Sequence, residues 1–83
     1  MKLKELLAGL DILSSSADLN TDIHEVQYDS RLVEPGDLFI AVPGAAADGH
    51  KFIPMAREKG AACVLCEKIP EGDVPFVQVA DTR

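Results

Sequence analysis

The chain has 83 residues, of which 47% are hydrophobic, and a formal net charge of −6 at pH 7. This length supports one small domain with a single core, and the acidic balance excludes nucleic acid as a partner because phosphate binding needs a basic face. No segment approaches the roughly 18 apolar residues of a membrane span, and residues 1–10 lack a signal-peptide core, so we expect a cytoplasmic protein with no membrane partner.

The first part of the chain predicts a helix followed by a loop. The leucines within residues 2–10 fall on one face of a short amphipathic helix. The three consecutive serines at positions 14–16 favour a loop, because short polar side chains compete for hydrogen bonds with their own backbone.

A first strand is predicted over residues 23–28. Its alternation places His24, Val26 and Tyr28 on one face. His24 has no second histidine, cysteine or carboxylate at metal-ligand spacing, so we interpret it as a surface or strand-edge histidine rather than a metal ligand.

The next segment predicts a strand and then a helix. Residues 37–42 are almost continuously apolar, as expected of a strand that is covered on both faces. A helix over residues 51–59 follows, because Pro54 is tolerated in a first turn and Gly60 supplies a C-terminal stop. Its apolar stripe consists of Phe52, Ile53, Met55 and Ala56.

The last part of the chain completes the sheet. The apolar run over residues 61–66 predicts a buried strand that lies parallel to the strand at residues 37–42. A turn at residues 70–73 leads to a strand over residues 74–79, which Pro75 either pushes to a sheet edge or shortens at its start. The predicted fold class is α/β: one small domain with a mixed sheet, a strand-helix-strand unit and a short N-terminal helix.

Cys63 and Cys66 form a Cys-x-x-Cys motif, a spacing that occurs in redox and zinc sites. Here the motif lies on a predicted apolar strand, and no second pair of ligands completes a zinc site. Because residues three apart on a strand point to opposite faces, the two thiols should not meet. We interpret both as buried, reduced structural cysteines; the alternative is a metal or redox role that needs a partner chain.

Polar residues near the strand ends have structural interpretations. Asp29 and Arg31 are interpreted as an exposed ion pair in a turn, and Asp48 and His50 as residues that hold the loop and the start of the helix. The Pro-Gly-Asp at residues 35–37 predicts a β-turn.

No constellation in the sequence predicts catalysis. Ser30 has no histidine placed by sequence as its base, and residues 44–49 lack the Gly-Lys-Ser/Thr of a P-loop. From the residues alone, the chain is a small α/β binding domain.

A longer pattern extends over turns, strands and the helix. It runs Asp-Ser-Arg-x-Val-x-Pro-Gly-Asp-Leu-Phe-Ile-Ala from residue 29, Gly-x-x-x-Asp-Gly-His-x-Phe-Ile-x-x-Ala from residue 44, and Gly-Ala-Ala from residue 60. This pattern resembles the N-terminal domain of the muramyl ligases of peptidoglycan synthesis, over about residues 25–83.

Three further features indicate a branch of that family. They are the Lys-Leu-x-Glu-Leu-Leu from residue 2, the tyrosine before Asp-Ser-Arg, and the ending Val-Ala-Asp-Thr-Arg. They are most similar to the third-residue-adding branch, UDP-N-acetylmuramoyl-L-alanyl-D-glutamate ligase, and the D-alanyl-D-alanine-adding branch is the alternative.

The resemblance implies that residues 1–83 are one part of a larger ligase. In that family the N-terminal domain holds the UDP moiety of the substrate, here UDP-N-acetylmuramoyl-L-alanyl-D-glutamate. A central domain binds ATP with magnesium, and a C-terminal domain brings the incoming amino acid. The fragment itself would need no cofactor and would depend on the missing domains for catalysis. The alternative from a different class is a non-enzymatic module that binds a protein at its sheet edge.

The resemblance also implies substrate contacts in two segments. Carried over residue by residue, they are Tyr28, Ser30, Ala45, Ala46 and Ala47, and no catalytic, cofactor-binding or metal-binding residue is assigned. A hydroxyl and exposed backbone N–H groups can hydrogen-bond a uridine nucleotide, and small side chains let it approach the backbone. Family members often carry larger polar residues in the second segment, so its three alanines favour backbone donors.

Overall fold

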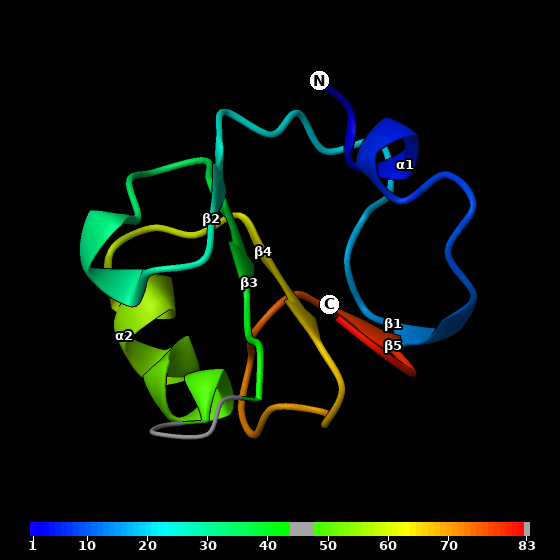
Figure 1. Ribbon diagram of the computed structural model, residues 1–83. Helices are drawn as coiled ribbons and strands as arrows, with labels where there is room; N and C mark the ends of the chain where they lie inside the picture. The colour runs from blue at the N-terminus through cyan, green and yellow to red at the C-terminus, as the bar shows by residue number, and fades with distance from the viewer. Residues whose placement is uncertain (44–47, 83) are drawn as a thin grey trace.

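A five-stranded sheet forms the centre of the computed structural model, which describes residues 1–43 and 48–82 (Figure 1). The strand order is β1 (Ile12–Ser15), β5 (Phe76–Val79), β4 (Cys63–Cys66), β3 (Leu38–Ile40) and β2 (Val26–Gln27). Neighbouring strands from β2 to β5 are parallel, and β1 runs antiparallel to β5. The predicted α/β fold with a mixed sheet is confirmed.

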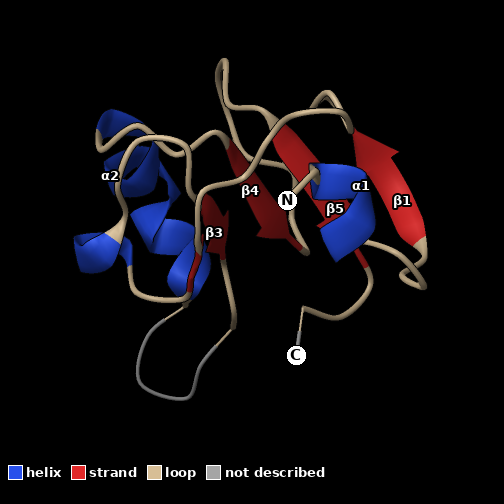
Figure 2. Cartoon of the chain, turned by 90° about the horizontal axis from the view of Figure 1, so that it is seen from above, coloured by secondary structure: helices blue, strands red, loops and turns tan. Residues whose placement is uncertain are grey.

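One helix covers each face of this sheet. Alternation along β3 sends Leu38 into a core with α1 (Leu3–Leu6), and Phe39 into a second core with α2 (Ile53–Glu58). Figure 2 shows the two helices on opposite sides of the strands. The nearly continuous apolar character of β3 follows from this double covering, and the predicted strand-helix-strand unit, β3-α2-β4, is confirmed.

The two cysteines of β4 occupy different cores. Cys63 packs on the α1 side and Cys66 on the α2 side, and both are buried and free. Burial raises the pKa of the Cys63 thiol to about 12 and that of Cys66 to about 11. The prediction of two separated, buried thiols is therefore confirmed.

The N-terminal helix is shorter than predicted. It ends at Leu6, and Leu7 is its C-cap. Gly9 has a φ of 86°, which lies outside the helical region, and the N–H of Leu10 bonds to the carbonyl of Leu7 at 3.0 Å. The leucine spacing alone overestimated the helix because the chain turns at this glycine.

The loop predicted for the serines is wrong, since Ser14 and Ser15 belong to strand β1. Their backbone pairs with β5, and the Ser16 hydroxyl accepts a hydrogen bond from the Phe76 N–H at 3.1 Å. Pairing with a distant strand supplies hydrogen bonds that outweigh the weak loop preference of serine.

Strand β5 lies inside the sheet, between β4 and β1, and not at its edge. Pro75 acts in the second of the two expected ways, because the strand begins at Phe76, directly after it. Strand β2 is also shorter than the predicted span of residues 23–28, although the N–H of His24 donates to the carbonyl of Gly36 at 2.9 Å.

The β-turn predicted around Pro35 is present. Gly36 has a φ of 89°, and the N–H of Asp37 donates to the carbonyl of Glu34 at 3.0 Å. The buried carboxylate of Asp37 accepts hydrogen bonds from the Glu34 N–H at 2.8 Å and from His24 Nδ1 at 2.9 Å. Burial alone would raise the pKa of Asp37, but these two donors lower it overall.

Within residues 1–43 and 48–82, no helix has the length and apolar character needed to cross a membrane.

Candidate ligand-binding site

The ends of β2 and β3 meet helical segments around one cleft of about 560 Å³. The cleft lies beside the short 3₁₀ helices η1 (Ser30–Leu32) and η2 (Gly49–Phe52) and the start of α2. It is lined by Tyr28, Asp29, Ser30, Arg31, Val42, Gly49, Phe52 and Met55. Two of the five predicted contact residues, Tyr28 and Ser30, thus share this cleft. The other three, Ala45, Ala46 and Ala47, lie outside the described residues.

Aromatic and hydroxyl groups line the cleft. Tyr28 and Phe52 are exposed, at 68% and 37%. Ser30 is buried, and its hydroxyl donates to the sulfur of Met55 at 3.5 Å. A thioether is a weak acceptor, so the hydroxyl can exchange this bond for a ligand oxygen at little cost.

Asp29 and Arg31 form the exposed ion pair that the sequence predicts. The Asp29 carboxylate accepts from the Arg31 backbone N–H at 2.9 Å and from its guanidinium Nη2 at 2.8 Å. The guanidinium hydrogen bonds lower the pKa of Asp29 to about 2 and raise that of Arg31. Among the described lining residues, Arg31 is the only cation, and it is already paired with a carboxylate.

The β3 side of the cleft depends on a close backbone contact. The N–H of Gly49 donates to the carbonyl of Val42 at 3.0 Å, and Pro43 and Asp48 form an isolated antiparallel bridge. A Cβ at position 49 would lie 2.7 Å from the Val42 nitrogen, a distance that real Cβ atoms essentially never show. Only glycine allows this approach without a backbone shift.

Asp48 and His50 hold the start of η2, as predicted. The Asp48 side chain accepts from the His50 N–H at 3.0 Å and from its ring Nδ1 at 2.7 Å. Both hydrogen bonds lower the pKa of Asp48, and the bond from the backbone N–H contributes more than the bond from the ring. Lys68 adds a longer ion pair to the same carboxylate, at 3.7 Å.

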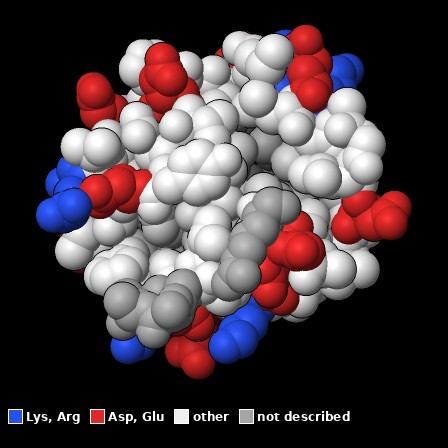
Figure 3. Space-filling view, in the orientation of Figure 1, with Lys and Arg blue, Asp and Glu red and all other residues white. Residues whose placement is uncertain are grey.

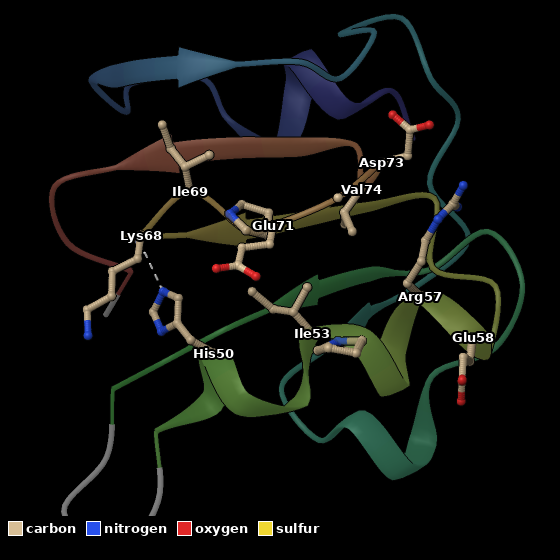
Figure 4. A pocket seen from close by; sticks show the side chains of 12 residues that line it. His50, Ile53, Arg57, Glu58, Lys68, Ile69, Glu71, Asp73 and Val74 are labelled. Carbon is tan, nitrogen blue, oxygen red and sulfur yellow. Dashed lines mark hydrogen bonds between the residues drawn. The ribbon is translucent and has the colours of Figure 1, made fainter.

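A second cleft, of about 550 Å³, lies between α2 and residues 68–74 (Figure 4). Ile53 and Val74 lie at its centre. Its charged lining residues are of both signs: Arg57, Lys68, Glu58, Glu71 and Asp73. Because the acids outnumber the bases, this cleft offers no net attraction to an anion. The first cleft is therefore the better candidate for an anionic ligand.

The charge distribution agrees with a site that relies on short-range contacts. Figure 3 shows acidic side chains spread around one face of the molecule rather than gathered opposite a basic patch. The part of the chain that the structure describes contains no group of three or more histidine, cysteine or acidic residues that could hold a metal ion.

Sequence reasoning missed four lining residues, Val42, Gly49, Phe52 and Met55. Phe52 and Met55 belong to the apolar stripe that predicted the helix, but Ile53 and Ala56 alone are buried against the sheet. The two pairs are offset by one position, so they face different sides of the helix. The sequence spacing shows that the two pairs lie on different sides of the helix. Only the position of the sheet identifies which pair lines the cleft.

Comparison with known protein families finds a match over residues 22–81 to the family described as "Mur ligase family, catalytic domain". The chain is also similar to curated ligases named UDP-N-acetylmuramoyl-L-alanyl-D-glutamate--2,6-diaminopimelate ligase. It is 46% identical to that of Clostridioides difficile over 100% of this chain and 17% of the relative. It is 45% identical to the ligase of that name from Bacteroides fragilis, over 100% of this chain and 18% of the relative. The chain thus spans less than a fifth of the length of these relatives.

Solved structures of MurF share the fold. A crystal structure of MurF from Acinetobacter baumannii superposes with a TM-score of 0.69 at 32% identity, covering 72% of this chain and 13% of that protein. The structure of MurF ligase from Thermotoga maritima in complex with ADP superposes with a TM-score of 0.69 at 28% identity. It covers 76% of this chain and 15% of that protein.

These names correct the narrower expectation drawn from the sequence. The prediction of UDP-N-acetylmuramoyl-L-alanyl-D-glutamate ligase is wrong. The relatives are named UDP-N-acetylmuramoyl-L-alanyl-D-glutamate--2,6-diaminopimelate ligase, and the solved structures are of MurF. The physical reason is that ligases with different names share this domain fold. The few residues at the ends of the pattern were therefore too little to designate a ligase.

Proposed function

Because the chain belongs to the Mur ligase family, we propose that it is the domain that holds the uridine diphosphate moiety of a UDP-N-acetylmuramoyl-peptide for a peptidoglycan-synthesis ligase. The observation that carries this proposal is the cleft at the ends of β2 and β3, where an exposed tyrosine, a serine hydroxyl and an arginine lie together. Ligands of α/β folds commonly bind outside the carboxyl ends of the strands.

The lining residues suit the parts of a uridine nucleotide. The rings of the exposed residues Tyr28 and Phe52 offer faces for the uracil base. The Ser30 hydroxyl and backbone N–H groups can hydrogen-bond polar atoms of the nucleotide. The predicted contacts at Ala45, Ala46 and Ala47 are part of this proposal, with the backbone as donor.

Binding by the isolated domain should be weak. The guanidinium of Arg31 forms an ion pair with the Asp29 carboxylate, with Nη2 and Oδ2 2.8 Å apart. It therefore attracts a diphosphate less strongly than an unpaired guanidinium would. The net charge of −6 opposes an anion at longer range. Contacts from other parts of a complete ligase would have to supply the remaining affinity.

The activity of the complete protein is also part of the proposal. The relatives' names contain UDP-N-acetylmuramoyl-L-alanyl-D-glutamate, which we propose among the peptide substrates, and one MurF structure contains ADP. In this proposal, ATP, magnesium and the incoming amino acid bind outside residues 1–83. The complete protein would act in the cytoplasm. These residues contain no P-loop lysine to clamp a transferred phosphoryl group, so we expect no ligase activity from them alone.

An NMR titration tests this function. UDP and UDP-N-acetylmuramic acid should shift the amide signals of residues 28–31 and 49–55, whereas ATP should not. Ser30→Ala removes one hydrogen bond to the ligand and should weaken binding by about 0.5–1.5 kcal/mol. Ser15→Ala, in the exposed strand β1, is the matched control and should bind as the wild type does. Shifts centred elsewhere, or equal affinity of the two serine variants, would contradict the proposed site.

A further inference from the structure

The side chain of His50 lies on the far side of η2 from the proposed ligand cleft. Gly49 and Phe52 line the ligand cleft, whereas His50, between them in sequence, lines the second cleft. The His50 side chain is only 11% exposed, and Figure 4 shows it beside Lys68 at one end of that cleft. One short helix thus presents neighbouring residues to two different clefts.

The hydrogen bonds of His50 identify its tautomer. Ring Nε2 lies 3.0 Å from the backbone nitrogen of Glu67 and 3.2 Å from that of Lys68. Both backbone groups are donors, so Nε2 must be the unprotonated acceptor. The ring proton is therefore on Nδ1, which donates to Asp48 Oδ1 at 2.7 Å.

The end of β4 is a firm anchor for this ring. The carbonyl of Glu67 accepts from Gln78 Nε2 in β5 at 3.0 Å, and its carboxylate accepts from the N–H of Thr82 at 3.1 Å. Residue 67 is thus connected to β5 and to Thr82 in the segment after it. By contrast, η2 has only four residues. The Gly49 N–H connects its start to Val42, and the ring of His50 adds a second connection, to the end of β4.

We propose that His50 is a positioning residue for the ligand cleft, which connects η2 to the end of β4 and so fixes Gly49 and Phe52 in the cleft wall. This inference rests on the proposed function. The Asp48 carboxylate, which accepts from ring Nδ1, also forms an ion pair with Lys68 at 3.7 Å, and Glu71 lines the same cleft as the ring. The connection from Nε2 to the sheet depends on the imidazole.

The first test detects the connection directly. In uniformly ¹⁵N-labelled protein, scalar coupling across the N–H···N hydrogen bonds should join His50 Nε2 to the amide nitrogens of Glu67 and Lys68. A structural histidine that merely fills space would show no such coupling. If the spectrum of the wild type lacks the coupling from His50 Nε2 to these amide nitrogens, the proposal is overturned.

The second test measures the consequence for UDP binding. His50→Phe keeps a planar ring but neither donates nor accepts, and it should weaken UDP binding about tenfold, because only about a tenth of the molecules would then keep the cleft in its binding geometry. His50→Gln retains an acceptor for the backbone N–H groups and should recover part of this loss, to about threefold.

His24→Phe is the matched control, because it removes the other histidine-aspartate hydrogen bond, at the opposite end of the strands. It should change UDP affinity by less than about twofold, as expected for an independent site. If the wild type shows no UDP binding, the proposed function fails, whatever the couplings show. If the wild type binds and a folded His50→Phe binds equally well, this inference fails while the proposed function stands. If His50→Phe does not fold, unchanged affinity in His50→Gln overturns the inference in the same way.

Discussion

The two histidine-aspartate pairs of this domain contain the same groups in opposite environments. In the pair near the start of β3, the Asp37 side chain is 1% exposed and the His24 ring is 59% exposed. In the pair beyond the end of β3, the His50 ring is 11% exposed and the Asp48 side chain is 32% exposed. In each pair, the more buried side chain accepts backbone N–H groups of residues outside the pair.

This difference shows what each pair does. The Asp37 carboxylate closes a turn by accepting the N–H of Glu34, three residues away, so its backbone hydrogen bond is local. The His50 imidazole accepts N–H groups 17 and 18 residues away, so it joins two segments. The first pair should therefore control the stability of the fold, and the second the geometry of the cleft.

The largest effect on stability should come from Asp37→Ala. The change removes a buried carboxylate that accepts from the Glu34 N–H and from His24, and it should lower the free energy of unfolding by about 3 kcal/mol. Urea denaturation followed by circular dichroism measures this loss. Asp73→Ala, at an exposed position, is the control, and equal denaturation midpoints of the two variants would break the distinction between the pairs.

Gly49→Ala should have the next largest effect, at the other end of the strands. The added Cβ would lie 2.7 Å from the Val42 nitrogen and 2.9 Å from its carbonyl oxygen. The backbone must shift, which should cost about 2 kcal/mol of stability and weaken UDP binding as well. Gly72→Asn is the control, because this residue has open space and asparagine tolerates its φ of 79°. Normal binding by Gly49→Ala would show that the close contact does not shape the cleft.

A smaller effect should appear in the pH dependence of stability. The Asp37 hydrogen bond raises the pKa of His24 above its ordinary 6.5, so the folded state binds the proton more tightly. The stabilisation is then fully present below pH 6.5 and is lost as the pH rises through the raised pKa. Urea midpoints of the wild type should fall over this range. Those of His24→Gln should stay level there, and parallel curves would contradict the assignment.

The smallest effect is expected at the cysteines, which lie in the sheet between the two pairs. Their pKa values of about 12 and about 11 leave almost no thiolate at neutral pH. An aromatic disulfide reagent should modify neither thiol in the folded protein and both after denaturation. Rapid modification without denaturant would show that β4 opens more readily than its burial indicates.

The sequence by itself determined the elements that depend on local periodicity and turn chemistry. Pro54 and Gly60 bounded the helix, the apolar run at β4 placed the cysteines on opposite faces, and the Pro-Gly turn before β3 was correct. In each case the deciding interaction lies within a few residues, so the local pattern contains the necessary information.

Only the tertiary structure decided the features that depend on distant segments. Strand β1 exists because β5 pairs with it, and this same pairing places β5 inside the sheet despite Pro75. Tyr28 and Ser30 share a cleft with Phe52 and Met55 because parallel strands bring their ends together. Hydrogen bonds and burial between residues far apart in the chain have no local sequence period, which is why pattern reasoning could not supply them.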